Sequence, residues 1–193
     1  EDAAVFYGLL QSRGRLYSRS SLTSPAVLLA DVSDPKAAFR DAALATDASS
    51  IYWALGKKIE GAWTIDVRRV AKDGSGAEVI ASWPIADFDH MVMTSDADAL
   101  YVSVAKGCSI CRVEKASGEQ SLLVPNEQDG PNCFALAVDD ERLYFARDAQ
   151  LLSMPKDGSV PPTLLADADV QWVTVDDAYV YAETFHSIFK LPK

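Results

Sequence analysis

The sequence predicts an all-β fold assembled from a repeated small antiparallel sheet, and three observations lead to this prediction. An Asp is followed five residues later by a Tyr at five places along the 193 residues. Short apolar stretches separated by turn residues recur with this marker, four to each complete copy. No stretch has a convincing helical period, because the nearest candidate, residues 35–44, is short and runs into a repeat strand. Units of this length with four strands are typical of the blades of a β-propeller.

The copies of the Asp-to-Tyr marker divide the chain into consecutive units. The pairs are Asp2/Tyr7, Asp47/Tyr52, Asp96/Tyr101, Asp139/Tyr144 and Asp176/Tyr181. We therefore expect a single propeller domain, or a fragment of one, with units at about 1–36, 37–86, 87–130, 131–168 and 169–193. An Asp in a turn accepts hydrogen bonds from backbone N–H groups that follow it, so these aspartates are expected to be structural. The tyrosines are expected to pack between blades.

Within a unit we name the predicted strands A to D in chain order. Strand A precedes the Asp, B carries the Tyr, C ends in a Lys, and D is rich in leucine. Strand A has a small residue at its centre, which fits an innermost strand crowded around a central channel. These residues are Ala45, Thr94, Ala137 and Thr174. Turns such as Asp73-Gly74 and Asp157-Gly158 join C to D, and Asp-Gly indicates a hairpin with φ above zero at both central positions.

Two segments carry a likeness to a known family. The marker Asp47-x-x-x-Ile51-Tyr52-Trp53, followed by the stretch Val67 to Gly74, resembles the repeat of YWTD/NHL-type propellers. It is more similar still to the repeats of bacterial secreted or lipoprotein propellers. The resemblance covers essentially the whole chain and implies architecture rather than activity, because propellers host unrelated functions. The Thr-Asp pair of the YWTD pattern is absent from every copy, so no calcium or ligand role tied to that pair is carried over.

The strand count predicts incomplete blades at both ends. The first unit lacks strand A and the last unit lacks strand D. Natural proteins avoid open sheet edges, so we expect this chain to be part of a longer polypeptide. The family analogy favours six blades, and five blades closed by strands from outside the chain are the alternative. The remainder of the propeller would come from further sequence or from another chain.

Composition and charge exclude several classes of protein. Hydrophobic residues make up 49 % and charged residues 24 % of the chain, which is typical of a folded globular protein. The formal net charge of −10 argues against non-specific binding to nucleic acid or to an anionic membrane. No apolar run is long enough for a transmembrane helix, so no membrane span is expected.

One set of polar residues is a candidate for binding at the mouth of the channel. Seven residues before the repeated Asp, at the start of strand A, stand Arg40, Asp89, Asn132 and Asp169. With Asp89 and Asp169 as ligands, such a ring could hold Ca²⁺ or Mg²⁺, although no cofactor is predicted outright. The alternative is that strand entries beside a wet channel are simply polar. The chain's two histidines, His90 and His186, are weak catalytic candidates together with Asp89.

The B–C connection of the second unit is longer than the others. It inserts Gly56 to Trp63, a basic segment that ends in a tryptophan. We expect a loop there, with Trp63 as a contact for a partner, or else a tolerated insertion.

The three cysteines favour a disulfide over a redox or metal motif. Cys108 lies in the B–C connection of the third unit, and Cys133 lies in the D–A connection that follows it. Those connections are neighbours on one side of a propeller, so we predict a Cys108–Cys133 bond, with Cys111–Cys133 as the alternative. A disulfide implies an oxidising compartment. We therefore expect an extracytoplasmic protein that is secreted, periplasmic or an outer-membrane lipoprotein.

Two functions remain open on the sequence alone, beside a third, structural possibility in which the propeller only scaffolds other domains. The first is an exported binding module that recognises a protein, a glycan or a small ligand on the side where the B–C and D–A connections lie. The second is an enzyme of the lyase or cyclotransferase type, with a metal or acid/base site at the channel mouth. The first is favoured because no acid/base pair is unmistakable.

Overall fold

The computed structural model describes residues 6–10, 15–21, 23–32, 37–104, 106–125 and 132–193. Across these residues the chain forms 18 strands in five antiparallel sheets, and none of them is helical. The all-β prediction is therefore confirmed. The Asp2 copy of the repeat marker lies outside the described residues.

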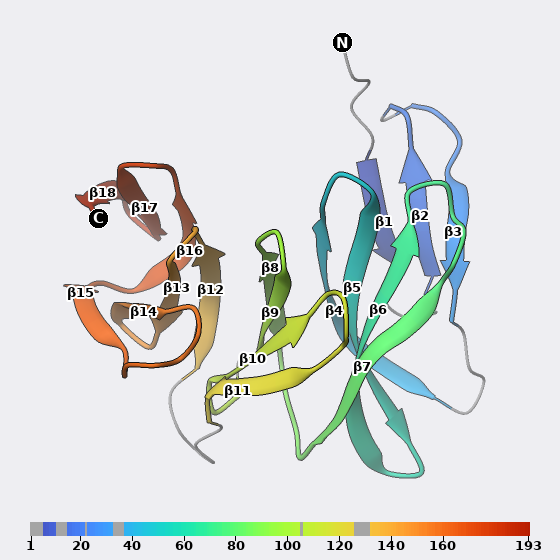
Figure 1. Ribbon diagram of the computed structural model, residues 1–193, viewed down its shortest axis with the longest axis horizontal. Coiled ribbons are helices and arrows are strands. Elements are labelled where there is room, and N and C mark those ends of the chain that lie inside the picture. Colours follow the sequence, from blue (N-terminus) through green and yellow to red (C-terminus); the bar gives the residue numbers. More distant parts are fainter. Residues whose placement is uncertain (1–5, 11–14, 22, 33–36, 105, 126–131) are drawn as a thin grey trace. The chain divides into compact units, whose positions relative to one another are not determined.

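Each sheet is formed from strands that follow one another along the chain, as Figure 1 shows. The first two sheets contain β1 (Phe6–Leu10), β2 (Arg15–Arg19) and β3 (Val27–Asp31), then β4 (Ala38–Thr46), β5 (Ser50–Ile59), β6 (Ala62–Ala71) and β7 (Glu78–Ile85). The third sheet contains β8 (Met91–Ser95), β9 (Ala99–Val104), β10 (Ser109–Glu114) and β11 (Gln120–Val124). The fourth contains β12 (Cys133–Val138), β13 (Arg142–Arg147), β14 (Gln150–Pro155) and β15 (Thr163–Asp167), and the fifth β16 (Val170–Val175), β17 (Tyr179–Thr184) and β18 (Ile188–Pro192).

The arrangement is that of a β-propeller with incomplete first and last blades. The three middle sheets have four strands each, and the first and fifth have three. Neighbours in each sheet are also neighbours in sequence, which is the meander of a propeller blade. The chain falls into two compact units, residues 1–87 with the first two sheets and residues 88–193 with the other three.

Consecutive sheets within each compact unit pack face to face through apolar side chains. In the first compact unit, Leu16 and Ala30 of the first sheet are buried against Ile51, Trp53 and Val70 of the second sheet. The second compact unit has two contacts of this kind. Between its first two sheets lie Tyr101, Cys108, Ile110, Cys133, Leu143, Phe145 and Met154, and between its last two lie Ala135, Ala137, Tyr144, Leu151, Val173, Val180 and Ala182. Because consecutive sheets pack through equivalent positions, the same types of apolar residue recur at those positions in each repeat.

The small residues of strand A stand where the inner strands meet. In the second compact unit, β12 lies beside β8 on one side and beside β16 on the other. Ala137 at the centre of β12 is buried in the contact with the fifth sheet. Small side chains let these strands approach closely, as the sequence pattern predicts.

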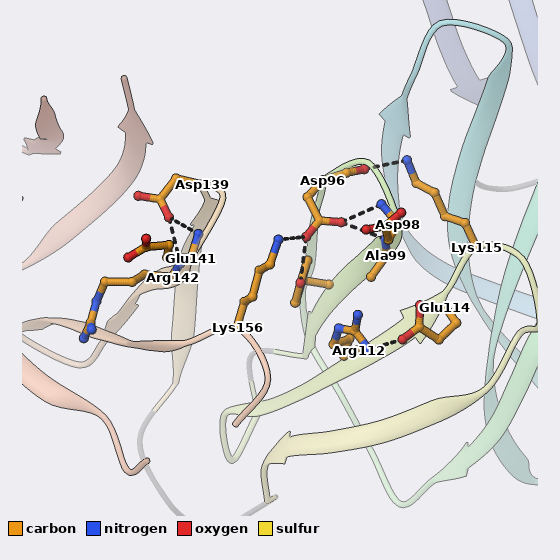
Figure 2. A network of polar contacts seen from close by, with 11 residues as sticks. Asp96, Asp98, Ala99, Arg112, Glu114, Lys115, Asp139, Glu141, Arg142 and Lys156 are labelled. Carbon is orange, nitrogen blue, oxygen red and sulfur yellow. Dashed lines mark hydrogen bonds and ion pairs between the residues drawn. The ribbon is translucent and has the colours of Figure 1, made fainter. Parts of the chain in front are cut away.

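The repeated Asp and Tyr form the same hydrogen-bonded turn in each described copy. In the third sheet, Asp96 Oδ1 accepts the backbone N–H groups of Asp98 at 2.9 Å and Ala99 at 2.7 Å (Figure 2). Its Oδ2 accepts the Tyr101 hydroxyl at 3.0 Å. The same pattern recurs at Asp47, Asp139 and Asp176, with Asp-to-Tyr distances of 3.0, 2.9 and 2.7 Å. The structural interpretation of these aspartates is confirmed.

The lysine that ends strand C joins this turn from the following sheet. Lys156 of the fourth sheet reaches Asp96 Oδ2 at 2.8 Å, as Figure 2 shows. Lys193, which follows the fifth sheet, reaches Asp139 Oδ2 at 2.6 Å. Asp96 and Asp139 therefore each cap their own turn and also hold the next blade. The repeated lysine of the third sheet, Lys115, instead donates to the backbone carbonyl of Asp96 at 2.7 Å. The repeat shows the three residue types, but it does not reveal that the lysine pairs with the Asp of the preceding sheet.

The Asp-Gly turns differ from the sequence prediction in one respect. Gly74 and Gly158 have φ of 87° and 74°, but the preceding aspartates are not in the left-handed region. The N–H of Gly74 donates to the Ala71 carbonyl at 2.8 Å, so only the last turn residue needs positive φ. A hairpin of this kind ends in a glycine at positive φ, and a separate register shift lies further along β6, between Val67 and Arg68.

Acid will remove the contribution of the Asp139 turn to stability. Burial alone would raise the pKa of Asp139, but hydrogen bonds from Lys193, two backbone amides and the tyrosine lower it from 3.8 to about 2. Because the folded-state pKa is the lower one, this stabilisation is present above pH 3.8 and is lost as the pH falls to about 2.

The test is urea unfolding between pH 2 and pH 7 for the wild type and for Asp139→Asn. We expect the wild type to be the more stable at neutral pH, with the difference disappearing towards pH 2. A stability difference that stays constant over this range would contradict the assignment.

Candidate functional site

The fourth sheet brings polar residues together along one edge. Its strand register places Cys133, Arg147, Gln150 and Asp167 in a single row across β12 to β15. We call this row the loop edge, because the β13–β14 turn and the connection to β16 leave the sheet there. The repeated Asp turns leave the sheet from the opposite edge, which we call the turn edge.

An open depression of ≈ 640 Å³ lies at the loop edge. It is lined by Arg147, Asp148, Ala149, Gln150, Asp167, Ala168 and Asp169. Three carboxylates and one guanidinium give the lining an acidic balance, which suits a positively charged group on a ligand. All of these residues belong to the second compact unit.

Two of the four residues predicted for a polar ring stand at this depression. Asp169 lines it and accepts a hydrogen bond from Gln171 Nε2 at 2.8 Å. Asn132 stands beside it, because its carbonyl accepts the N–H of Asp148 at 3.0 Å and its own N–H lies 3.3 Å from Asp148 Oδ1. Asp148 has φ of 51°, so this turn is held in a conformation that few side chains adopt.

An exposed aromatic residue lies next to the acidic lining. Phe185 is 74 % exposed in the β17–β18 connection. It follows Thr184, which is paired with Val170, and Val170 directly follows Asp169. Phe185 and Asp169 therefore leave neighbouring strands at the same end of the fifth sheet. An apolar ring beside carboxylates is a combination that protein interfaces use.

Arg40, the ring candidate of the first compact unit, has contacts of its own there. Its Nη1 donates to Asp87 Oδ1 at 2.8 Å, and its guanidinium lies 4.8 Å from the centroid of the Trp63 ring. Asp89 and His90 lie in the connection between β7 and β8, and His186 lies beside Phe185. The binding role of Arg40 and the catalytic roles of Asp89, His90 and His186 stay predictions.

The segment 56–63 is not the loop that the sequence predicts. Its residues extend β5 and β6, which are ten residues each, and the hairpin turns at Glu60 and Gly61. Trp63 is 9 % exposed, with Lys58 at 5.3 Å from its ring on the paired strand. The loop prediction was wrong because the added residues continue the strand pairing instead of interrupting it. Whether Trp63 touches a partner stays a prediction.

The long hairpin buries a charged cluster that sequence analysis missed. Asp66 is 1 % exposed, and its Oδ2 accepts Lys57 Nζ at 2.6 Å and Arg68 Nη2 at 3.0 Å. Its Oδ1 accepts the Ser82 hydroxyl at 2.8 Å. Burial alone would raise the pKa of Asp66, but these hydrogen bonds outweigh it and lower the pKa. The cluster fixes three neighbouring strands, β5, β6 and β7, to one another.

The predicted Cys108–Cys133 disulfide is present. It joins the β9–β10 connection of the third sheet to the first residue of β12, and both cysteines are 1 % exposed. Cys133 belongs to the loop-edge row, so the bond anchors the sheet beside the depression. The remaining thiol, Cys111, is buried, and burial raises its pKa to about 11. Because Cys108 and Cys133 are bonded to each other, neither a free Cys108-x-x-Cys111 pair nor the alternative Cys111–Cys133 bond is present.

Within the described ranges, no three His, Cys, Asp or Glu side chains are grouped so that they could hold a metal ion. In particular, Asp148, Asp167 and Asp169 line one depression without converging on one point. Among the same residues, no helix has the length and apolar character that crossing a membrane requires.

A second open depression, of ≈ 650 Å³, lies at the turn edge of the fourth and fifth sheets. Its lining includes Asp139, Tyr144, Asp176 and Lys193. The Asp139, Tyr144 and Lys193 side chains already bond one another in the repeated turn. We therefore place the candidate site at the loop edge, whose carboxylates, Asp148, Asp167 and Asp169, take no part in the repeated Asp–Tyr–Lys turn.

Several residues of the candidate site could not be found from the sequence. Arg147 and Gln150 face each other across the β13–β14 turn, but Asp167 is 17 residues beyond Gln150 and joins them only through the register of β14 and β15. The sequence does show a run of polar residues around the β13–β14 turn. Such a run is typical of any exposed hairpin, and it points to a site only when the position of β15 beside it is known.

No family model matches this chain, and no curated protein matches it in sequence. Solved structures do match. A crystal structure of a nidogen/laminin complex aligns with a TM-score of 0.52 and 11 % identity, over 97 % of this chain and 88 % of that one. This chain and the aligned chain of that complex share the fold. A computationally designed protein, Ika8, aligns at 0.63 with 13 % identity, over 98 % and 57 %. The major allergen Mala s 1 of Malassezia sympodialis aligns at 0.59 with 14 % identity, over 98 % and 75 %.

Proposed function

We propose that this chain is an exported β-propeller module that binds a protein partner at the loop edge of its fourth and fifth sheets. The observation that carries the proposal is the open acidic depression around Asp148, Asp167 and Asp169, with the exposed Phe185 beside it. The partner would present a lysine or arginine to the carboxylates and an apolar side chain to the phenyl ring. Further sheets, from additional sequence or another chain, would complete the propeller.

Two further observations support this proposal. One solved structure of the same fold is a nidogen/laminin complex, so this fold is found in a protein assembly. The Cys108–Cys133 disulfide supports export, because disulfides form and persist in oxidising compartments. Propellers commonly bind through the connections at one end of their blades, where sequence can vary without disturbing the sheets.

The test uses a photo-crosslinking residue at one of two matched alanines. Ala149 lines the depression, and Ala178 lies in the exposed Asp turn of the fifth sheet at the other edge. Both variants are incubated with the secreted and cell-surface proteins of the source organism. We expect a protein to be crosslinked from position 149 and not from position 178. Equal capture from both positions would contradict the proposal.

The affinity of the captured protein for charge variants then tests whether the carboxylates of the depression contribute to binding. Asp169→Lys is expected to weaken its binding about tenfold or more, because it places a like charge against the partner's cation. Asp177→Lys, at the turn edge, makes the same change in net charge and is the control. If both variants weaken binding equally, the effect comes from net charge and not from the depression.

A further inference from the structure

One face of the fifth sheet is exposed although the same face is covered in the preceding sheets. Register places Trp172, Glu183 and Ile188 in one row across β16 to β18, and Thr174, Tyr181 and Lys190 in another on the same face. The opposite face, with Val173, Val180 and Ala182, packs on the fourth sheet. We call the exposed side, defined by Trp172, Tyr181, Glu183 and Ile188, the open face.

Equivalent positions in the third and fourth sheets show what normally covers this face. Ile110 and Leu151, which correspond to Ile188, are each 0 % exposed, whereas Ile188 is 74 % exposed. Ala135 is 4 % exposed, and Trp172 at the same repeat position is 53 % exposed. In the third and fourth sheets the covering element is the next sheet of the chain. The open face therefore presents apolar area that the repeat elsewhere buries.

The Asp turn of the fifth sheet gives an independent indication. Asp96 and Asp139 each bind the lysine that follows strand C of the next sheet, at 2.8 and 2.6 Å. Asp176 makes the same contacts to its turn and to Tyr181, at 2.8, 2.8 and 2.7 Å. Among the described residues, however, no lysine lies within ion-pair distance of it; Lys193, which binds Asp139, acts on it only through space and helps to lower its pKa. The turn is thus built to receive a lysine from a sheet that packs on the open face.

We propose that the open face is the docking surface for a further sheet of this same repeat, whose third strand ends in a lysine that binds Asp176. Two features of the face limit which sheet fits. Trp172 and Glu183 stand where the fourth sheet has the small Ala135 and Ala146. The docking sheet therefore has a hollow for the indole and a donor for the carboxylate. This inference is independent of which protein the loop edge binds.

The first sheet of the chain does not have these properties. Ser21 occupies the position of the repeated lysine, so that sheet supplies no ammonium group for Asp176. Arg19 stands where other sheets have an apolar residue, such as Val70 or Met154, on the face that packs on the preceding blade. The occupant is accordingly another copy of the repeat that retains both the apolar face and the lysine.

The experiment extends the chain by one repeat in phase. Lys193 has the repeat position of Lys156, so a second copy of residues 157–193 can follow it directly and supplies a fourth strand, a sixth sheet and a final lysine. The tryptophan of the added copy is replaced by alanine, and the Trp172 emission is taken as the difference from a matched Trp172→Phe chain, because Trp53, Trp63 and Trp83 also emit. We expect the Trp172 emission to shift to the blue and the melting temperature to rise by about 5 °C.

Substitutions on the open face separate docking from a mere increase in length. Ile188→Ser is expected to leave the melting temperature of the original chain unchanged and to lower that of the extended chain. Replacing the final lysine of the added copy by methionine should cancel part of the rise, and should have no effect when Asp176 is already Asn. Trp172→Ala/Glu183→Ala reproduces the face of the fourth sheet, and we expect it to raise the melting temperature of the extended chain further.

Two results would overturn the proposal. One is an extended Trp172→Ala/Glu183→Ala chain that melts no higher than its unextended counterpart or is insensitive to the final lysine. The other is a dimer of the original chain in light scattering that Ile188→Glu dissociates, because the occupant would then be a second copy of this chain.

Discussion

Removing the Cys108–Cys133 disulfide is expected to lower the free energy of unfolding by about 3–4 kcal/mol. The bond closes a sequence separation of 25 residues, and in the chain-entropy model a loop of that length restricts the unfolded chain by this amount. It also ties the third sheet to the fourth at a point where both cysteines are buried. The change is Cys108→Ser/Cys133→Ser, measured by urea unfolding.

The control is Cys111→Ala, introduced into both proteins. It prevents the remaining thiol from pairing with either bridge cysteine, and it removes one small buried group, so its own cost is expected to be about 1 kcal/mol. Reduction of the Cys111→Ala protein should reproduce the destabilisation of the double serine variant. If reduction and substitution both change stability by less than about 1 kcal/mol, the bond does not restrict the unfolded chain as the chain-entropy model requires.

Local patterns were sufficient to predict the fold. The Asp-to-Tyr marker, the lysine after strand C and the small residues of strand A each reflect a contact made within one blade or between consecutive blades. Such contacts repeat with the sequence, so their spacing reveals the unit. The Cys108–Cys133 bond was predictable for the same reason, because the repeat placed both cysteines in neighbouring connections.

The candidate site was only partly predictable because it depends on features that do not repeat. Asp169 and Asn132 were found from their shared position before strand A. Asp167 joins Arg147 and Gln150 only through the register of β14 and β15, which the bulge between Leu151 and Leu152 shifts. The shift itself recurs at the equivalent position in the first three sheets, but the combination of polar residues that it aligns in the fourth sheet does not.

The first compact unit shows the same limit at Asp66. Its residues belong to a hairpin that is longer than in the other blades, so no other copy has an equivalent carboxylate. The alternation of β6 puts Asp66 on the face opposite to Ile65 and Val67, where a sequence reader expects an exposed charge, yet Asp66 is 1 % exposed. Only the paired positions of Lys57 and Ser82 on the neighbouring strands make a charge acceptable there.

Replacing Asp66 by alanine is expected to lower the free energy of unfolding by about 3–5 kcal/mol. The variant leaves the Lys57 ammonium and the Arg68 guanidinium, which are 24 % and 18 % exposed, without their shared carboxylate. Breaking a buried ion pair costs more than the pair contributes, because the remaining charges stay poorly solvated. Urea unfolding measures the loss, and circular dichroism shows whether the sheets still form.

The matched control is Glu78→Gln in the same sheet. Glu78 also pairs with an arginine, Arg69, but its side chain is 51 % exposed, so its loss is expected to cost less than about 1 kcal/mol. Asp66→Asn separates charge from shape, since the amide keeps the size of the side chain but not its negative charge. We expect an intermediate loss of stability.

The pH dependence of these variants decides whether the Asp66 charge is responsible. Hydrogen bonds lower the folded-state pKa of Asp66 despite its burial, so the stabilisation is present above pH 3.8 and is lost as the pH falls through the folded value. The difference in stability between the wild type and Asp66→Asn should therefore narrow below pH 3.8. A constant difference would show that the asparagine fails for reasons of packing. In that case the long hairpin is held by the Trp63 contacts and strand pairing and not by its buried charge.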